Sequence, residues 1–132
     1  MINLGDVMAR TVVSVAPEDT LGEAAQKMAD EGVGSAVVLD HGRLIGILTE
    51  RDLLKAVAGR VHSSEARVRE WMTEDPITAS SETSAEDAVR TMLEHGFRHL
   101  PVVEEGRTIG VVSLRECVRR TVEVGGFEGL SV

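Results

Sequence analysis

The chain repeats itself, and this repeat constrains the fold more than any other feature. Residues 4–54 align without a gap with residues 68–118, at a constant offset of 64 positions. Two copies of one unit therefore make up nearly all of the 132 residues. A unit of about 50 residues is too small to bury a sufficient core alone, so both copies are expected to form one stable object. Identical pairs include Met8 and Met72, Gly32 and Gly96, and Gly46 and Gly110.

Within each copy the residue pattern predicts the order β-α-β-β-α, which places the chain in the α+β class. A hydroxyl residue with an acid three positions later predicts the start of the first helix, and a glycine suited to a left-handed C-cap ends it. Two apolar strands around a glycine turn then predict a β-hairpin, followed by a second helix. The predicted strands are 12–15, 35–39, 44–48, 77–79, 99–103 and 108–112, and the second helices are 50–58 and 114–122.

These boundaries divide the chain into repeat 1 over residues 1–66, repeat 2 over residues 67–122, and a flexible C-terminal tail over residues 123–132. Each repeat has one sheet face that its own helices leave uncovered. The two repeats are therefore expected to pack sheet to sheet with pseudo-two-fold symmetry.

Charge and composition exclude several classes of function. The chain has 14 Lys and Arg against 22 Asp and Glu, for a net charge of −8, and only three aromatic residues. General binding to nucleic acid or to an anionic membrane surface is not expected, since both require positive charge. No apolar run is long enough to span a bilayer, and no secretory signal is visible. With Cys117 as the one cysteine, these features predict a cytoplasmic protein.

Four motifs, each present in both copies, resemble the CBS domain family over about residues 4–120. Such domains occur in tandem pairs, called Bateman modules, which commonly bind adenosine-containing ligands. The resemblance implies a stand-alone Bateman module that binds AMP, ADP, ATP, NAD or S-adenosylmethionine. The motifs include Trp71-Met72, Val13-Ser14, Gly96-Phe97-Arg98-His99-Leu100-Pro101-Val102-Val103 and Gly46-Ile47-Leu48-Thr49-Glu50-Arg51-Asp52.

The segment ending in Thr49 and Asp52 carries the clearest ligand chemistry. A predicted strand leads Thr49 to a helix N-terminus, where unpaired backbone N–H groups and the helix dipole favour a phosphate. Asp52 can accept hydrogen bonds from both hydroxyls of a ribose, and Gly46 leaves space near the strand. The second copy has Ser113 and the longer Glu116 instead. The same residue pairs also form capping boxes, which need no ligand.

Further site residues follow from the resemblance. Arg98 and His99 stand where the first copy has Gly34 and Ser35, and a basic residue at this place reaches ligand phosphates in related modules. The alternative is a surface pair that contacts a neighbouring carboxylate. The family pattern lines the adenine slot with backbone groups and small apolar side chains at Val13, Ser14, Ala36, Val37, Ile77, Thr78, Leu100 and Pro101.

The remaining residues do not indicate an enzyme. No nucleophile is paired with a base, and the four histidines and Cys117 show no metal-ligand spacing, so we expect no catalytic residue, no metal and no required cofactor. The predicted function is regulatory, with ligand occupancy signalled to a protein partner. The alternative is an interaction or scaffold module with vestigial pockets. Apolar residues in helices 50–58 and 114–122 predict a homodimer.

Overall fold

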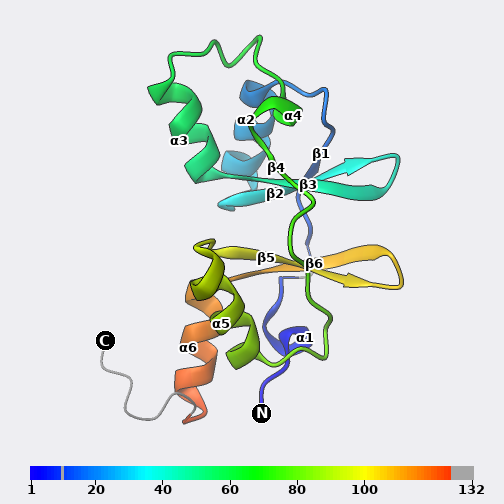
Figure 1. Cartoon of the computed structure of the whole chain (residues 1–132), viewed down its shortest axis with the longest axis vertical. Helices are drawn as coiled ribbons and strands as arrows, with labels where there is room; N and C mark the ends of the chain where they lie inside the picture. The colour runs from blue at the N-terminus through cyan, green and yellow to red at the C-terminus, as the bar shows by residue number, and fades with distance from the viewer. Residues whose placement is uncertain (10, 126–132) are drawn as a thin grey trace. The chain divides into compact units, whose positions relative to one another are not determined.

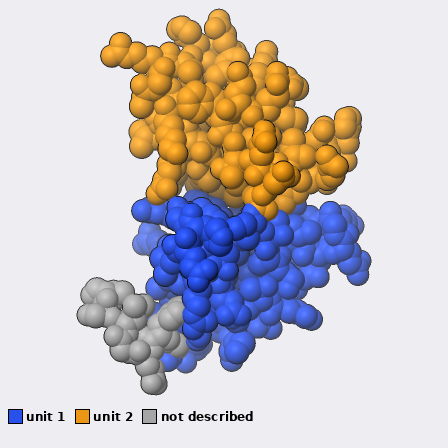
Figure 2. All heavy atoms as spheres, in the orientation of Figure 1, with its two compact units in different colours: residues 1–11, 77–132 blue, residues 12–76 orange. Residues whose placement is uncertain are grey.

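The computed structural model describes residues 1–9 and 11–125, and these form two compact units (Figures 1 and 2). Unit 1 is built from residues 1–11 and 77–132, and unit 2 from residues 12–76. Most of the predicted C-terminal tail, residues 126–132, lies outside the described residues. In the part that the structure describes, no helix combines the length and apolar character needed to cross a bilayer.

Unit 2 is a four-stranded sheet with helices, in the order β1-β2-β3-β4 (Figure 1). β1 runs parallel to β2, and the β2–β3 and β3–β4 pairs are antiparallel. The predicted hairpin and both predicted helices of the first repeat are confirmed. The strands are β1 (Ser14–Val15), β2 (Ser35–Asp40), β3 (Arg43–Thr49) and β4 (Thr73–Glu74), and the helices are α2 (Leu21–Glu31), α3 (Glu50–Ala58) and α4 (Val68–Trp71).

Unit 1 repeats this plan with fewer regular strands. Its hairpin pairs β5 (His99–Glu104) with β6 (Arg107–Ser113), and its helices are α1 (Leu4–Val7), α5 (Ala85–His95) and α6 (Leu114–Glu123). Single bridges join Ala79 to Val102 and Ala9 to Val111, at the positions that β1 and β4 occupy in unit 2. The α+β class and its repeated strand-helix unit are thus confirmed.

The predicted strand 77–79 is reduced to one bridge, and Pro101 explains why. In unit 2 the backbone N–H of Val37 donates to the carbonyl of Val13 at 2.9 Å, which extends the parallel ladder. Pro101 occupies the equivalent position and has no N–H to donate to Ile77. The ladder in unit 1 therefore keeps only the bonds on either side of Ala79.

The opening segment of each repeat packs into the unit formed mostly by the other repeat. Helix α1 opens the first repeat but contacts α5 and α6 in unit 1, whereas α4 and β4 open the second repeat and belong to unit 2. Leu4 in α1 and Val68 in α4 are both 0% exposed within these cores. The exchanged segments are therefore structural parts of each unit, although neither short helix was predicted.

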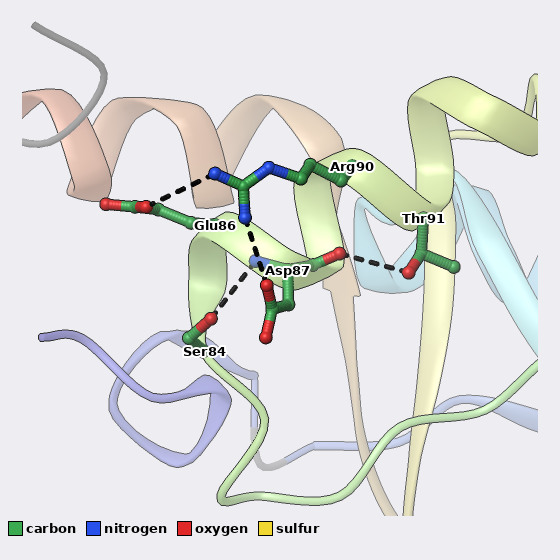
Figure 3. Close-up of polar contacts among 5 residues, drawn as sticks. All are labelled: Ser84, Glu86, Asp87, Arg90 and Thr91. Atoms are coloured by element: carbon green, nitrogen blue, oxygen red, sulfur yellow. Dashed lines mark hydrogen bonds and ion pairs between the residues drawn. The ribbon is translucent and has the colours of Figure 1, made fainter.

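Helices α2 and α5 begin and end at the predicted residues, and the two helices differ in one capping bond. Gly32 and Gly96 take left-handed backbone conformations (φ 67° and 75°) that end α2 and α5. Thr20 and Glu23 form both hydrogen bonds of a capping box, whereas Ser84 makes only one. Figure 3 shows the reason. The side chain of Asp87 pairs with Arg90 at 3.0 Å, so it does not reach back to the backbone of Ser84.

The tight turns of both hairpins also match their prediction. The two central residues of each turn have positive φ angles, which is the geometry that matches the right-handed twist of the flanking strands. The first central residue of each turn is not a glycine, although its φ angle is positive. The angles are 51° and 83° at His41 and Gly42, and 49° and 78° at Glu105 and Gly106.

A carboxylate clamp in unit 1 should make its stability depend on pH. Glu104 accepts hydrogen bonds from the backbone N–H of Ser81 at 2.9 Å and from the Ser81 hydroxyl, and these bonds lower the pKa of Glu104 below 4.5. A lowered pKa stabilises the fold above the unfolded value of about 4.5, and this contribution is lost as pH falls through the folded value. In melts between neutral and acid pH, Glu104→Gln should flatten the acid decline in Tm. An unchanged decline would show that the clamp contributes nothing.

Candidate functional site

Unit 2 contains six of the predicted site residues, on strands β1, β2 and β3 and in the segments that flank them. In the sheet register Ser14 pairs with Val37, and Ser35 pairs with Thr49 at the end of β3. Val13 directly precedes β1, Ala36 lies in β2, and Asp52 lies in the first turn of α3. Residues from three separate parts of the sequence therefore meet at the end of β3. The side chains of Val13 and Ala36 are buried in the core, and the lining of an adenine slot by these residues stays a prediction.

Thr49 and Asp52 form a complete capping box. The backbone N–H of Thr49 donates to Oδ2 of Asp52 at 2.8 Å, its hydroxyl lies 3.0 Å from the same oxygen, and Asp52 N–H donates back to Thr49 Oγ1 at 3.3 Å. Both side chains are half-buried. Within the described residues, Oδ1 of Asp52 accepts no hydrogen bond. The pair is thus held rigidly, with one carboxylate oxygen available to an external donor.

Fewer helix N–H groups are available for a phosphate than predicted. The N–H of Glu50 donates to the carbonyl of Gly34 at 3.0 Å, and that of Asp52 is used by Thr49. The helix dipole still favours an anion here. A phosphate at this helix would rely on other side chains more than on free amides, because the Thr49 hydroxyl already donates to Oδ2 of Asp52.

Gly46 has a different role from the one expected. A Cβ atom at this position would lie 2.5 Å from Sδ of Met72 and 3.0 Å from the carbonyl oxygen of Thr73. Gly110 is confined in the same way, by Met8 at 2.7 Å and Ala9 at 3.0 Å. Both glycines therefore admit the exchanged segment beside the sheet, and the space beside Gly46 is not free for a ligand.

One contact in unit 2 was missed from the sequence. Lys27 of α2 donates from Nζ to the carbonyl oxygen of Ser14 at 2.6 Å. Because Val13 O is also occupied, by the N–H of Val37, two carbonyls at the expected base slot already have donors. The aligned residue in the second repeat is Thr91, whose hydroxyl donates instead to Asp87 O in its own helix. The alignment of the two repeats could have indicated this contact, because Lys27 in the first repeat aligns with Thr91 in the second.

The equivalent carboxylate in unit 1 is engaged elsewhere. Ser113 Oγ accepts from the N–H of Glu116 at 3.2 Å, but Glu116 does not return a bond to Ser113. Instead Glu116 Oε1 pairs with Arg119 at 2.8 Å, and this contact raises the pKa of Arg119. The additional methylene of Glu116 lets its carboxylate reach along the helix. The two copies therefore present their carboxylates differently.

The other predicted residues of unit 1 surround the start of β5. Arg98 is exposed, its carbonyl accepts from Leu114 N–H at 2.8 Å, and its guanidinium makes no ion pair within the described residues. His99 pairs with Ser113 in the β5–β6 register. The Leu100 side chain is part of the core.

Open backbone acceptors occur at the start of unit 1. Ile77 and Thr78 are exposed, and no donor among the described residues reaches their carbonyl oxygens. For Ile77 the cause is Pro101, which lacks the N–H that Val37 supplies in unit 2. An adenine amino group could donate to carbonyls of this kind. Unit 1 thus has two exposed backbone acceptors without a donor among the described residues.

The remaining nucleophile is a core residue. Cys117 is 0% exposed, and burial, together with the nearby Glu116, raises its pKa to about 11. The thiol therefore stays protonated and packs as a small hydrophobe. Among the described residues, no group of three or more His, Cys, Asp and Glu side chains is placed to hold a metal ion.

Sequence comparison identifies relatives over both repeats. The model of the CBS domain family matches residues 4–59 and 68–123. An uncharacterized 17.7 kDa protein of Acidianus ambivalens is 37% identical over 123 residues, which are 92% of this chain and 74% of that protein. An inosine-5'-monophosphate dehydrogenase from Methanocaldococcus jannaschii is 32% identical over 117 residues, and this chain spans only 23% of its length.

Solved structures show the same fold. A CBS domain protein of Pyrobaculum aerophilum, determined in complex with AMP, has a TM-score of 0.84 and 29% identity, with 94% of this chain and 97% of that chain covered. A CBS-domain containing protein of Agrobacterium tumefaciens has a TM-score of 0.83 and 35% identity, with 89% and 98% covered. The resemblance seen in the sequence motifs is confirmed.

Proposed function

The chain belongs to the CBS domain family, as a tandem pair, and from this premise we propose that it is a regulatory module that binds an adenosine-containing ligand. The observation that carries the proposal is the rigid Thr49–Asp52 pair with Oδ1 of Asp52 unused. A similar protein from Pyrobaculum aerophilum was determined with AMP, which makes AMP the first candidate. We further propose that ligand occupancy is signalled to a protein partner in the cytoplasm, without catalysis.

The proposal assigns roles to the residues that the structure leaves available. Asp52 accepts the ribose hydroxyls through Oδ1, and the Thr49 hydroxyl, which donates to Oδ2, holds that carboxylate in position. In unit 1, Arg98 supplies a positive charge for a ligand phosphate, since it has no ion-pair partner among the described residues. Also in unit 1, the carbonyls of Ile77 and Thr78 accept from the amino group of an adenine. Ser113, Glu116 and His99 are secondary, because Glu116 is held by Arg119.

A thermal-shift panel tests the proposed function. A ligand that binds only the folded protein stabilises it by about 2.7 kcal/mol at a concentration of about 100 times its Kd. We expect at least one of AMP, ADP, ATP, NAD and S-adenosylmethionine to raise Tm, while guanosine and inorganic phosphate do not. No shift with any of the five would favour the alternative, an interaction module with vestigial pockets. The Glu116–Arg119 pair is the observation on which that alternative rests.

Arg98 should distinguish charged from uncharged ligands. Arg98→Ala should weaken AMP binding several-fold and leave adenosine binding nearly unchanged, because only the phosphate loses a charged donor. Calorimetric titrations with both ligands measure the difference, and Arg107→Ala, which changes an exposed arginine at the far end of β6, serves as the charge-matched control. Equal losses for AMP and adenosine would remove Arg98 from the phosphate site.

We also propose a homodimer formed through α3 and α6. Leu54 and Val57 are 69% and 72% exposed on α3, and Val122 is 48% exposed on α6, so these helices have apolar side chains that a second copy could cover. Sedimentation at micromolar concentration should show twice the chain mass of 14.2 kDa, and Leu54→Glu together with Val57→Glu should produce monomers. A monomeric wild-type protein would contradict this assembly.

A further inference from the structure

An open pocket in unit 2 lies at the connection between α3 and α4, on residues that none of the roles above uses. We call it the Trp71 pocket; its volume is about 450 Å³. Its apolar part consists of side chains that pack partly against the unit 2 core, and its polar part carries two carboxylates. The lining residues are Val61, His62, Glu65, Ala66, Glu70 and Trp71.

The pocket is held in place by backbone hydrogen bonds. The carbonyls of Ser63 and Ala66 accept from the first amides of α2 at 2.8 and 2.9 Å, and Ala66 N–H donates to His62 O at 2.8 Å. Trp71 packs beneath Gly59, where an added Cβ atom would lie 3.5 Å from the indole. The lining is therefore organised before any partner arrives, which lowers the entropic cost of binding.

The charges of the pocket are not neutralised. Neither Glu65 nor Glu70 forms an ion pair with another described residue, and Glu70 Oε1 accepts only the N–H of Arg67, at 2.7 Å. The nearest cations in sequence point elsewhere, since Arg69 pairs with Glu18 and Arg67 donates to Glu18 O. A half-buried indole thus lies beside two carboxylates that lack a counter-charge.

From this juxtaposition we propose that the Trp71 pocket is a docking surface for a basic peptide segment of a partner protein, and that it receives an arginine or lysine side chain. An alkyl chain that ends in a cation can cover the apolar wall, approach the indole and pair with the carboxylates. An anion would be repelled. A neutral apolar group would bury the carboxylates without compensation. The net charge of −8 also favours a basic partner.

Trp71 is the only tryptophan and the chain has no tyrosine, so intrinsic fluorescence reports on this pocket directly. The probe is a capped alanine peptide that carries several arginines, titrated at low salt. Its control is the same peptide with glutamates. The arginine peptide should change the Trp71 emission saturably, and the glutamate peptide should not. No saturable change with the arginine peptide would overturn the proposal.

Two matched variants separate the pocket from general attraction between opposite charges. Glu65→Gln with Glu70→Gln keeps the hydrogen-bond acceptor for Arg67 and should weaken peptide binding about tenfold. Glu31→Gln with Asp40→Asn removes the same charge outside the pocket and should change affinity less than about twofold. Equal losses in both variants would overturn the proposal. If the first variant does not fold, Glu65→Gln alone applies, because Glu65 makes no side-chain bond within the described residues.

Two further arms define the ligand class. Agmatine, a small guanidinium compound, should bind far more weakly than the peptide, and equal binding would overturn the assignment to a peptide segment. AMP at saturation should not compete with the peptide for the pocket. The inference is independent of nucleotide binding, so failure in the adenosine-ligand panel leaves this test unaffected.

Discussion

Asp52→Ala should weaken AMP binding by between about tenfold and 150-fold, equivalent to about 1.5–3 kcal/mol. The lost interaction is a hydrogen bond from the ribose to a charged acceptor, Oδ1 of Asp52, which no described residue uses. Calorimetric titration of the folded variant measures the loss. Glu116→Ala should have a much smaller effect, because Arg119 already occupies that carboxylate.

The same substitution also removes the Asp52 half of the capping box, and this effect needs its own control. Loss of the cap should lower the free energy of unfolding by about 1 kcal/mol. Glu23→Ala breaks the equivalent capping box of α2, where no ligand contact is proposed. It should therefore cause a similar loss of stability with no loss of affinity. If Asp52→Ala binds AMP as tightly as the wild type, the Thr49–Asp52 pair is only a cap.

Leu4→Ala should destabilise unit 1 by about 2–5 kcal/mol, the cost of removing a large side chain from a closed core. Leu4 is 0% exposed and comes from a helix of four residues at the start of the first repeat. Urea denaturation measures the loss. Leu93→Ala, at a position 65% exposed on α5, serves as the control and should change stability by less than about 0.5 kcal/mol.

The part of the chain that each substitution destabilises tests which unit α1 and α4 belong to. Hydrogen exchange in Leu4→Ala should accelerate first in β5 and β6 of unit 1, and Val68→Ala should instead accelerate β2 and β3 of unit 2. The opposite pattern, with Leu4→Ala loosening β2 and β3, would show that the segment before residue 12 does not belong to unit 1.

Much of the fold was predictable because its signals are local. Thr20, Ser84, Gly32 and Gly96 mark helix ends through contacts within a few residues, and all four predictions are confirmed. The short helices α1 and α4 were missed because four residues carry no periodicity. What holds them is tertiary burial of Leu4 and Val68. An alignment of the repeats also gives no information about which unit the opening segment of each repeat packs into.

The candidate site was predictable in residue type but less so in contacts. The spacing of Thr49 and Asp52 implied their capping box, which the structure contains. The reach of Glu116 to Arg119 depends on side-chain rotamers that spacing does not specify. Gly46 was assigned to ligand space because its neighbour Met72 is distant in sequence. Its actual constraint is a non-local contact between the sheet and the exchanged segment.

The most direct test of adenosine-ligand binding is an amide NMR titration of the isotopically labelled protein with AMP. We expect saturable shifts at Thr49 and Asp52 and at the residues around Ile77 and Thr78, with smaller shifts at Ser113 and Glu116. The proposed function would be contradicted by two results together. AMP would shift none of these amide resonances, and AMP, ADP, ATP, NAD and S-adenosylmethionine would all leave Tm unchanged.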